Sequence, residues 1–266
     1  MMKLAVIGGF GKMGKRIIEF ALAEKDIQVV CAVEQKGSPV LGKKICECFP
    51  AGDGNGHGAF TEDLDGNADV VIDFSSPQST MTYLKLAAQK KTAYVIGTTG
   101  LSEEQIAEVR ALSQKIPVVQ SPNMSIGVNL LFQLTREVAA VLGPQGYDIE
   151  LVELHHNKKK DSPSGTAKKL LQMAAEGGKL NVKDAVYGRE GILGERKKSE
   201  IGVLSVRAGD IVGEHTVYFV GNNERIELTH RAHSRDTFAR GALAAARFII
   251  GKKPGIYDMQ DVLGMK

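Results

Sequence analysis

The sequence predicts an α/β protein in which a doubly wound parallel sheet is followed by a second α+β domain with a mixed sheet of about four strands. Two observations predict the first sheet. Short apolar runs alternate with helical patterns over residues 1–125, and a glycine-rich turn follows the first run. A third observation predicts the second domain, because beyond residue 125 the alternation stops and three strand-like segments follow one another within residues 201–232. Regular alternation of strands and helices is typical of parallel sheets.

The glycine-rich turn belongs to a βαβ unit. Glycines at positions 8, 11 and 14 lie between a buried strand over 3–7 and a helical pattern over 15–24, and a second strand over 27–33 ends at Glu34. Glycine lets the backbone turn tightly and approach a pyrophosphate, and a carboxylate about 20 residues further on can accept from a ribose hydroxyl. The unit predicts a Rossmann-type dinucleotide-binding domain. The alternative is a tight structural turn in some other α/β protein.

Further strands over 68–74, 92–96 and 116–120 alternate with helices over 78–89 and 103–114. Ligands of such sheets bind beyond the carboxyl ends of the strands. Two loops fall there, although each could also be an ordinary βα turn: Gly97-Thr98-Thr99-Gly100 and Ser121-Pro122-Asn123-Met124-Ser125. The glycine-rich segment 37–58 predicts a long loop with little regular structure.

The second half predicts a long helix over 128–142, a strand over 147–154 and three more strands over 201–206, 214–220 and 225–232. We expect this sheet to be largely antiparallel. A final helical pattern covers 237–251. The sequence alone places a domain boundary near residue 125 and leaves that last helix unassigned.

The most informative stretch is Glu153 to Ala167, which reads ELHHNKKKDSPSGTA. His155 and His156 end a predicted strand, three lysines follow at 158–160, and Pro163 fits the first position of a helix capped by Asp161 or Ser162. A helix N-terminus exposes unpaired N–H groups and suits an anion. The stretch therefore predicts a site that holds a carboxylate or phosphate and moves protons beside it. The alternative is a solvated polar face; a metal site is disfavoured, because neighbouring histidines of a strand point different ways.

Composition excludes several classes of function. A net charge of +3 and the absence of Trp argue against nucleic acid as a partner. The three cysteines, all within the first 48 residues, do not form a disulfide framework, which indicates a reducing, cytoplasmic location. The first strand begins at once, without a signal peptide, and no uninterrupted apolar run approaches the length of a membrane span.

Several segments resemble the dihydrodipicolinate reductase (4-hydroxy-tetrahydrodipicolinate reductase) family, over nearly the whole chain. ELHHNKKKDSPSGTA is the most specific of them. Lys12 stands where the family usually has arginine, and Ser162 where alanine is common. The other segments are GGFGKMG, GTTG, SPNMS, RAGDIVGEH (207–215), THRAHSR (229–235) and MQDVLG near the end of the chain.

The resemblance implies NAD(P)H-dependent reduction of 4-hydroxy-tetrahydrodipicolinate, a cyclic dicarboxylate, to tetrahydrodipicolinate in lysine and diaminopimelate biosynthesis. It also implies a dinucleotide-binding domain of residues 1–125 on which residues 236–266 pack back. Residues 126–235 would form a substrate-binding and oligomerisation domain that builds a homotetramer. We expect NADH to be preferred and NADPH to be usable, because Glu34 suits a ribose diol and Gln35 follows it where many family members carry a basic residue.

The resemblance also implies roles for individual residues. His155 is expected to donate and accept a proton and Lys159 to donate one, while the roles of Lys158 and Lys160 stay open. Substrate contacts are expected from His156, Gly165 and Thr166. Cofactor contacts are expected from Gly8, Gly9, Phe10, Gly11, Lys12, Met13, Glu34, Gly97, Thr98, Thr99, Ser121, Pro122, Asn123 and Met124.

Two alternative functions share parts of this pattern. A semialdehyde dehydrogenase of similar layout needs a cysteine nucleophile in its second domain, and Cys31, Cys46 and Cys48 all lie in the first. A nucleotide-sensing regulatory module would need no proton-transfer residues and would usually carry a segment for binding a partner. Neither pattern fits the sequence as well as a reductase does.

Overall fold

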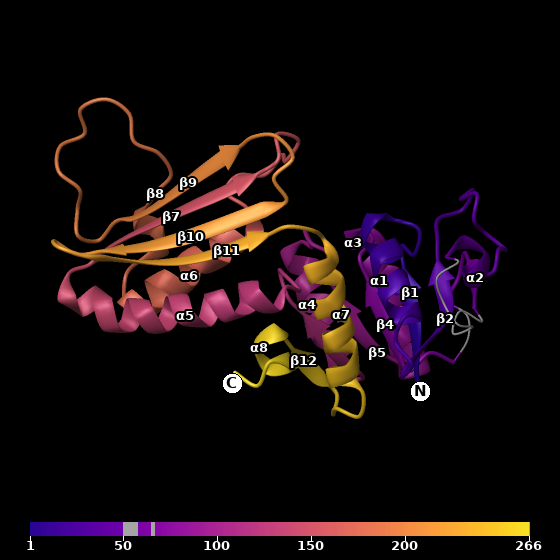
Figure 1. Cartoon of the computed structure of the whole chain (residues 1–266). Helices are drawn as coiled ribbons and strands as arrows, with labels where there is room; N and C mark the ends of the chain where they lie inside the picture. The colour runs from indigo at the N-terminus through magenta and orange to yellow at the C-terminus, as the bar shows by residue number, and fades with distance from the viewer. Residues whose placement is uncertain (50–57, 65–66, 266) are drawn as a thin grey trace. The chain divides into compact units, whose positions relative to one another are not determined.

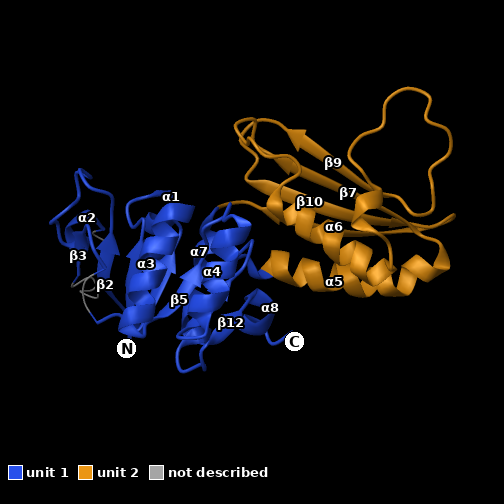
Figure 2. Ribbon diagram, turned by 180° about the vertical axis from the view of Figure 1, so that it is seen from behind, with its two compact units in different colours: residues 1–126, 235–266 blue, residues 127–234 orange. Residues whose placement is uncertain are grey.

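The computed structural model describes residues 1–49, 58–64 and 67–265 (Figure 1). The chain divides into two compact units (Figure 2): residues 1–126 with 235–266, and residues 127–234. The segment 37–58, expected to be a loop, contains a short helix α2 (Ile45–Cys48), and its residues 50–57 lie outside the described part.

The first unit is built on a seven-stranded parallel sheet in the order β12-β6-β5-β4-β1-β2-β3. The predicted Rossmann-type sheet is confirmed. Because β1 pairs with β2 on one side and with β4 on the other, the strand order reverses between β1 and β4, where such sheets bind ligands. The strands are β1 (Met2–Ile7), β2 (Ile27–Val33), β3 (Ala59–Thr61), β4 (Val70–Asp73), β5 (Ala93–Ile96), β6 (Pro117–Gln120) and β12 (Gly255–Tyr257).

Helices cover both faces of this sheet. Side chains of α1 (Lys12–Leu22) and α7 (Asp236–Ile249) share one core cluster, and those of α3 (Pro77–Lys90) and α4 (Glu103–Ser113) share the cluster on the other face. Arg16 of α1 ties the two helices of the first face together, because its guanidinium donates to both carboxylate oxygens of Asp236, at 2.7 and 2.9 Å. A short helix α8 (Met259–Val262) follows β12. The last helix, which the sequence alone leaves unassigned, therefore packs within the first unit.

The second unit contains a five-stranded mixed sheet in the order β11-β10-β7-β9-β8. The expected mixed sheet is confirmed, with a fifth strand of only two residues. It is less antiparallel than expected, because β9 runs parallel to β7 after the chain has crossed over through a helix. The strands are β7 (Asp148–His155), β8 (Ala185–Val186), β9 (Ile201–Arg207), β10 (Gly213–Val220) and β11 (Arg225–Ala232).

Two helices, α5 (Ile126–Leu142) and α6 (Gly165–Gly178), cover one face of this mixed sheet (Figure 1). Alternate residues of β7 and β10, such as Leu151 and Val217, are fully buried between the sheet and these helices. Short 3-10 turns follow α5 and α6, at η1 (Gly143–Gln145) and η2 (Val182–Asp184).

One helical stretch of the described chain, residues 126–145, is long and apolar enough to cross a membrane by length and composition alone. Helices of a protein core also meet these two criteria. Here Leu131 and Phe132 of the stretch are buried in the core of the second unit, and Arg136 with Glu137 interrupt its apolar run.

Candidate active site

The turn after β1 leaves no room for a side chain at two of its glycines, Gly9 and Gly14. Gly8 has a φ of +72°, and a Cβ on Gly14 would lie 2.1 Å from the Gly8 carbonyl oxygen. A Cβ on Gly9 would lie 2.8 Å from the Cβ of Ala32 in β2. Helix α1 therefore begins directly behind the turn, with Gly11 as its N-cap. Its first N–H groups and a backbone without side chains suit a pyrophosphate.

Glu34 is joined to this turn by hydrogen bonds. Its carboxylate accepts from the backbone N–H of Phe10 at 2.7 Å and from that of Gln35 at 3.3 Å. Lys12 is exposed at the first position of α1, and Met13 packs partly against the core. The carboxylate at the end of β2 is thus oriented by the glycine turn.

A cavity of about 630 Å³ opens beside these residues. Its walls come from the turns after β1, β2 and β4, at the point where the strand order reverses. A dinucleotide fits this setting: glycines for close approach, Glu34 for a ribose, and a cavity where parallel sheets bind nucleotides. The lining residues are Ile7, Gly8, Gly11, Val33, Glu34, Gln35, Phe74, Ser75, Ser76, Gln78, Ser79, Thr82 and Tyr83.

The β4–α3 turn was missed as part of this site by sequence reasoning. It is held by Asp73, a fully buried carboxylate that accepts from the Ser75 N–H at 2.9 Å and the Tyr94 hydroxyl at 2.8 Å. The hydroxyl of Thr98 also lies 3.2 Å from Asp73. The β4–α3 turn lines the cavity because β4 lies beside β1 in the sheet. Only the strand order could have indicated this, and no local sequence motif reveals the strand order.

The two other expected cofactor loops do not line the cavity. Gly97 follows β5 and packs on an aromatic face, since a Cβ there would lie 2.3 Å from the Phe74 ring. Thr98 is buried and Thr99 is exposed. After β6, the Ser121 hydroxyl donates to the Asn123 carbonyl at 2.9 Å, while Pro122 is exposed and Met124 is buried. Both loops lie at carboxyl ends of strands, and their contact with a cofactor stays a prediction.

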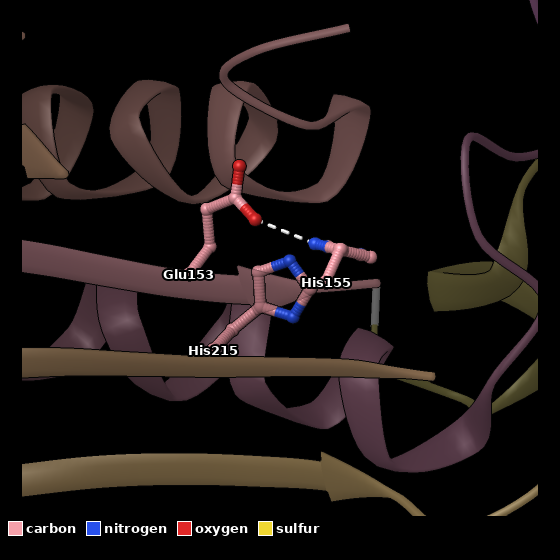
Figure 3. A group of neighbouring side chains, drawn as sticks. All are labelled: Glu153, His155 and His215. Atoms are coloured by element: carbon pink, nitrogen blue, oxygen red, sulfur yellow. Dashed lines mark hydrogen bonds and ion pairs between the residues drawn. The ribbon is translucent and has the colours of Figure 1, made fainter. Parts of the chain in front are cut away.

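In the second unit, β7 ends with a buried carboxylate beside a histidine (Figure 3). Glu153 is fully buried, and one of its oxygens lies 2.5 Å from Nδ1 of His155. The guanidinium of Arg207 on β9 donates to both carboxylate oxygens, at 2.7 and 2.9 Å. The Ser205 hydroxyl donates at 2.8 Å and the Ser164 N–H at 3.1 Å. Burial alone would raise the pKa of Glu153, but these hydrogen bonds hold it well below its usual range.

Helix α6 begins at Gly165, two residues later than predicted. Ser164 is its N-cap, because the Ser164 hydroxyl accepts from the Ala167 N–H at 3.1 Å. Pro163 precedes the cap and is not the first helical residue, so the expected cap at Asp161 or Ser162 was wrong. The reason is that Ser164 can reach the N–H three positions on, which is the usual geometry of a cap. Gly165 is exposed at the first helical position, and Thr166 is buried behind it.

The remaining predicted residues surround the same strand end. The His156 backbone N–H donates to the Ile211 carbonyl at 2.8 Å. The ammonium of Lys159 lies 2.8 Å from the Asp161 carboxylate, and its side chain is mostly covered. Lys158 and Lys160 are exposed. Of the three lysines, Lys159 is therefore the one held against the folded chain.

His215 of β10 completes the cluster. Its ring packs edge-on against the His155 ring at 5.3 Å between centroids, and its Nε2 lies 3.1 Å from the Ser164 hydroxyl. Burial, and then the neighbouring His155, lower the pKa of His215 to about 3, so it is neutral at physiological pH. Glu153, His155 and His215 lie close enough to ligate a metal ion. The Glu153 carboxylate already accepts hydrogen bonds from Arg207, Ser205 and Ser164, however, and the positive charge of Arg207 beside it disfavours a metal cation.

Sequence reasoning missed Arg207, His215 and Ser205, and it assigned no role to Glu153. Arg207 and His215 are the first and last residues of the RAGDIVGEH segment. Their position at the two ends of this family-specific segment is the feature of the sequence that could have indicated a role. Nothing local indicated that both reach β7, because that depends on β9 and β10 pairing with it on either side.

Comparison with known proteins agrees with this geometry. Two family models match the chain, one described as the N-terminus of dihydrodipicolinate reductase at residues 2–124 and the other as its C-terminus at 127–263. The 4-hydroxy-tetrahydrodipicolinate reductase of Desulfotalea psychrophila is 49% identical over 269 residues, covering 100% of this chain and 99% of that protein. The enzyme of that name from Syntrophotalea carbinolica is 50% identical over 270 residues, with all of both chains covered.

Solved structures show the same likeness. Dipicolinate-bound dihydrodipicolinate reductase from Paenisporosarcina sp. TG-14 has a TM-score of 0.74 and 25% identity, with 98% of both chains covered. A probable dehydrogenase from Thermotoga maritima, at 11% identity and a TM-score of 0.64, covers 98% of this chain and 92% of its own, and it shares the fold alone. The chain therefore belongs to the dihydrodipicolinate reductase family, whose members are NAD(P)H-dependent oxidoreductases.

Proposed function

We propose that this protein reduces 4-hydroxy-tetrahydrodipicolinate to tetrahydrodipicolinate with NAD(P)H, in lysine and diaminopimelate biosynthesis. The observation that carries the proposal is the pairing of His155 with a buried carboxylate next to the anion-ready start of α6. Residues 1–125 with 236–266 would bind the dinucleotide, and residues 126–235 the substrate. The name and full-length identity of the relatives support the same reaction.

The chain would contribute charge, orientation and protons. Bound NAD(P)H supplies the hydride. Nε2 of His155 and the ammonium of Lys159 would give or take the proton that accompanies it, a role that typically contributes about 10²–10⁴-fold to a rate. The N–H groups of Gly165 and Thr166, at the positive end of α6, would hold one substrate carboxylate. His156 would contact the substrate beside them.

A coupled assay tests the reaction. The substrate is generated in situ by the upstream synthase, and the fall of NADH absorbance is followed with and without this protein. We expect oxidation of NADH only when both the synthase and this protein are present. The His155→Gln variant, prepared in the same way, serves as the control for a contaminating reductase. No NADH oxidation by the unaltered protein would refute the proposed function.

We further propose that NADH is the preferred cofactor. The Glu34 carboxylate would accept from the ribose hydroxyls of NADH and repel the 2′-phosphate of NADPH, which an arginine would bind bidentately. Gln35 lines the same cavity and brings no charge. Lys12 and Lys36 could offer the 2′-phosphate only flexible point charges in place of a bidentate arginine.

The variant Gln35→Arg should move the balance toward NADPH. Its guanidinium would enter the cavity beside Glu34 and offer the fork that the 2′-phosphate lacks in the unaltered protein. The measurement is kcat/KM for both cofactors in both proteins, with Lys91→Arg on the distant end of α3 as control. A tenfold preference of the unaltered protein for NADPH, about 1.4 kcal/mol in the wrong direction, would contradict this reading of Glu34.

We also propose a homotetramer in the cytoplasm, with no nucleic acid or membrane as partner. None of the three cysteines forms a disulfide, which supports a reducing compartment. Self-association is supported by the face of the second sheet that no helix of the described residues covers, because this face carries exposed apolar side chains.

A further inference from the structure

The Glu153 carboxylate is connected to two parts of the second unit at once. Through Oε2 it meets Nδ1 of His155, and through Oε1 it accepts from the N–H of Ser164, the cap of α6. Arg207 and Ser205 donate to the same carboxylate from β9. A buried charge is tolerated only when it is paired and hydrogen-bonded. The Glu153 carboxylate meets this condition, because it makes all five of these contacts.

The contact with His155 determines which ring nitrogen carries the proton. A carboxylate accepts from an N–H, so a neutral His155 next to Glu153 carries its proton on Nδ1 and leaves the Nε2 lone pair for a reacting group. Space at Nε2 is kept open by Gly213, since a Cβ there would lie 3.0 Å from this nitrogen. The same glycine lies within the RAGDIVGEH segment.

The contact with Ser164 fixes the other half of the site. The Ser164 N–H donates to Glu153, while its hydroxyl accepts from Ala167 and also meets Nε2 of the buried, neutral His215. The start of α6 is therefore held from two strands, β7 and β10. A shift of the helix relative to β7 would break the bond to Glu153.

We propose that Glu153 is a positioning residue: its single carboxylate fixes the Nδ1–H tautomer and ring orientation of His155 and holds the start of α6 in register with it. Arg207 and Ser205 hold that carboxylate, and His215 holds the helix cap. Two residues of the RAGDIVGEH segment, Arg207 and His215, thus hold Glu153 and Ser164 of the ELHHNKKKDSPSGTA stretch in place. The expected effect of Glu153 on catalysis rests on the proposed function, whereas its effect on the tautomer of His155 does not.

The test is the tautomer of His155 in the intact protein labelled with ¹⁵N-histidine. Two-bond ¹H–¹⁵N correlation spectra distinguish Nδ1–H from Nε2–H, and His155→Gln assigns the signals by removing them. We expect the Nδ1–H form in the unaltered protein. In Glu153→Gln, the amide can donate as well as accept, so we expect a mixture of tautomers and a roughly 10²-fold lower kcat, in line with losing a general acid–base contribution, while the KM for NADH changes less than twofold.

Glu150→Gln is the matched control, because Glu150 lies on the same strand and is also paired with arginine, in its case Arg189 and Arg196. It should leave the His155 signals and kcat unchanged. If Glu153→Gln does not fold because Arg207 is left unpaired, the double variant Glu153→Gln with Arg207→Gln removes both charges and is measured instead. An unchanged His155 tautomer in the folded variant overturns the proposal, even if kcat falls. Normal kcat in His155→Gln would refute the role of His155 in the proposed function. The inference about Glu153 would still be decided by the His155 tautomer in the unaltered protein and in Glu153→Gln.

Discussion

At the scale of single residues, the two groups expected to move protons have different surroundings. His155 is held by a fully buried carboxylate, whereas Lys159 pairs with Asp161, whose side chain is 57% exposed. Because Asp161 is open to solvent, this pair is close to a surface salt bridge, which contributes about 0–1 kcal/mol, and it holds Lys159 less firmly than the buried carboxylate holds His155. The predicted role of Lys159 would require its ammonium to leave Asp161, whereas Glu153 already orients the His155 ring.

We predict that His155→Gln and Lys159→Ala each lower kcat and leave NADH binding nearly intact. Each change removes a proton donor from the second unit and touches neither the glycine turn nor Glu34. The expected loss is on the order of 3–5 kcal/mol of transition-state stabilisation. Steady-state kinetics and NADH fluorescence titration measure the two effects, with Lys158→Ala as the control from the exposed part of the lysine run. A kcat close to normal in both variants would contradict the assignment.

A second residue-scale prediction concerns His215 and acid. Burial lowers its pKa to about 3, below the ordinary value near 6.5. Between these two pH values, His215 is therefore protonated in the unfolded chain but neutral in the folded protein. Stability is then lost as the pH falls below 6.5, by about 2 kcal/mol at pH 5. Glu153 has a depressed pKa, so it contributes stability above its unfolded pKa near 4.5 and adds little to this change.

The variant His215→Gln should lose less stability between pH 7.5 and pH 5 than the unaltered protein. Glutamine keeps a polar partner for Ser164 and has no proton to take up. Urea unfolding at the two pH values gives the difference, and His233→Gln, which replaces a more exposed histidine, is the control. An equal loss of stability in both proteins would mean that His215 does not resist protonation in the folded state.

At the scale of elements, the sequence predicts most of this fold, and the misses have physical causes. Strands such as β1 and β2 have long apolar patterns, whereas β3, β12 and β8, of two or three residues, are too short to show one. The parallel pairing of β7 with β9 depends on a crossover through α6, which no local pattern encodes. The site follows the same rule. His155 and Lys159 lie in one dense motif, but Arg207 and His215 become neighbours of Glu153 only through strand pairing.

The turn between β1 and α1 gives an element-scale prediction. A Cβ at position 14 would meet the Gly8 carbonyl oxygen and the Gly9 Cα, both backbone atoms that cannot rotate away. Gly14→Ala should therefore push α1 off the turn, lowering stability by about 1–3 kcal/mol and weakening NADH binding at least tenfold. Thermal unfolding and fluorescence titration test both effects. Gly188→Ala adds the same methyl group in open space and should change neither.

At the scale of the whole molecule, the second sheet has one face without a helix in the described chain. Val152 and Leu154 of β7 pair with Leu204 and Val206 of β9 on that face, and the last two are 36% and 40% exposed. At the other end of the same face, Arg189 and Arg196 donate to Glu150, so that end carries charge of its own. The apolar part is the feature that a second copy of the chain would cover, because contiguous apolar surface on a sheet marks an interaction site.

We predict that the homotetramer depends on this apolar face. Leu204→Lys places a charge where a partner sheet would pack, and an unpaired buried charge is costly, so the assembly should dissociate. Light scattering coupled to size-exclusion chromatography at micromolar concentration measures the mass of both proteins. Val182→Lys adds the same charge at an exposed apolar position of η2 and should keep the assembly intact. A monomeric unaltered protein would overturn the tetramer, whereas a tetramer that survives Leu204→Lys would place its interface on another surface of the chain.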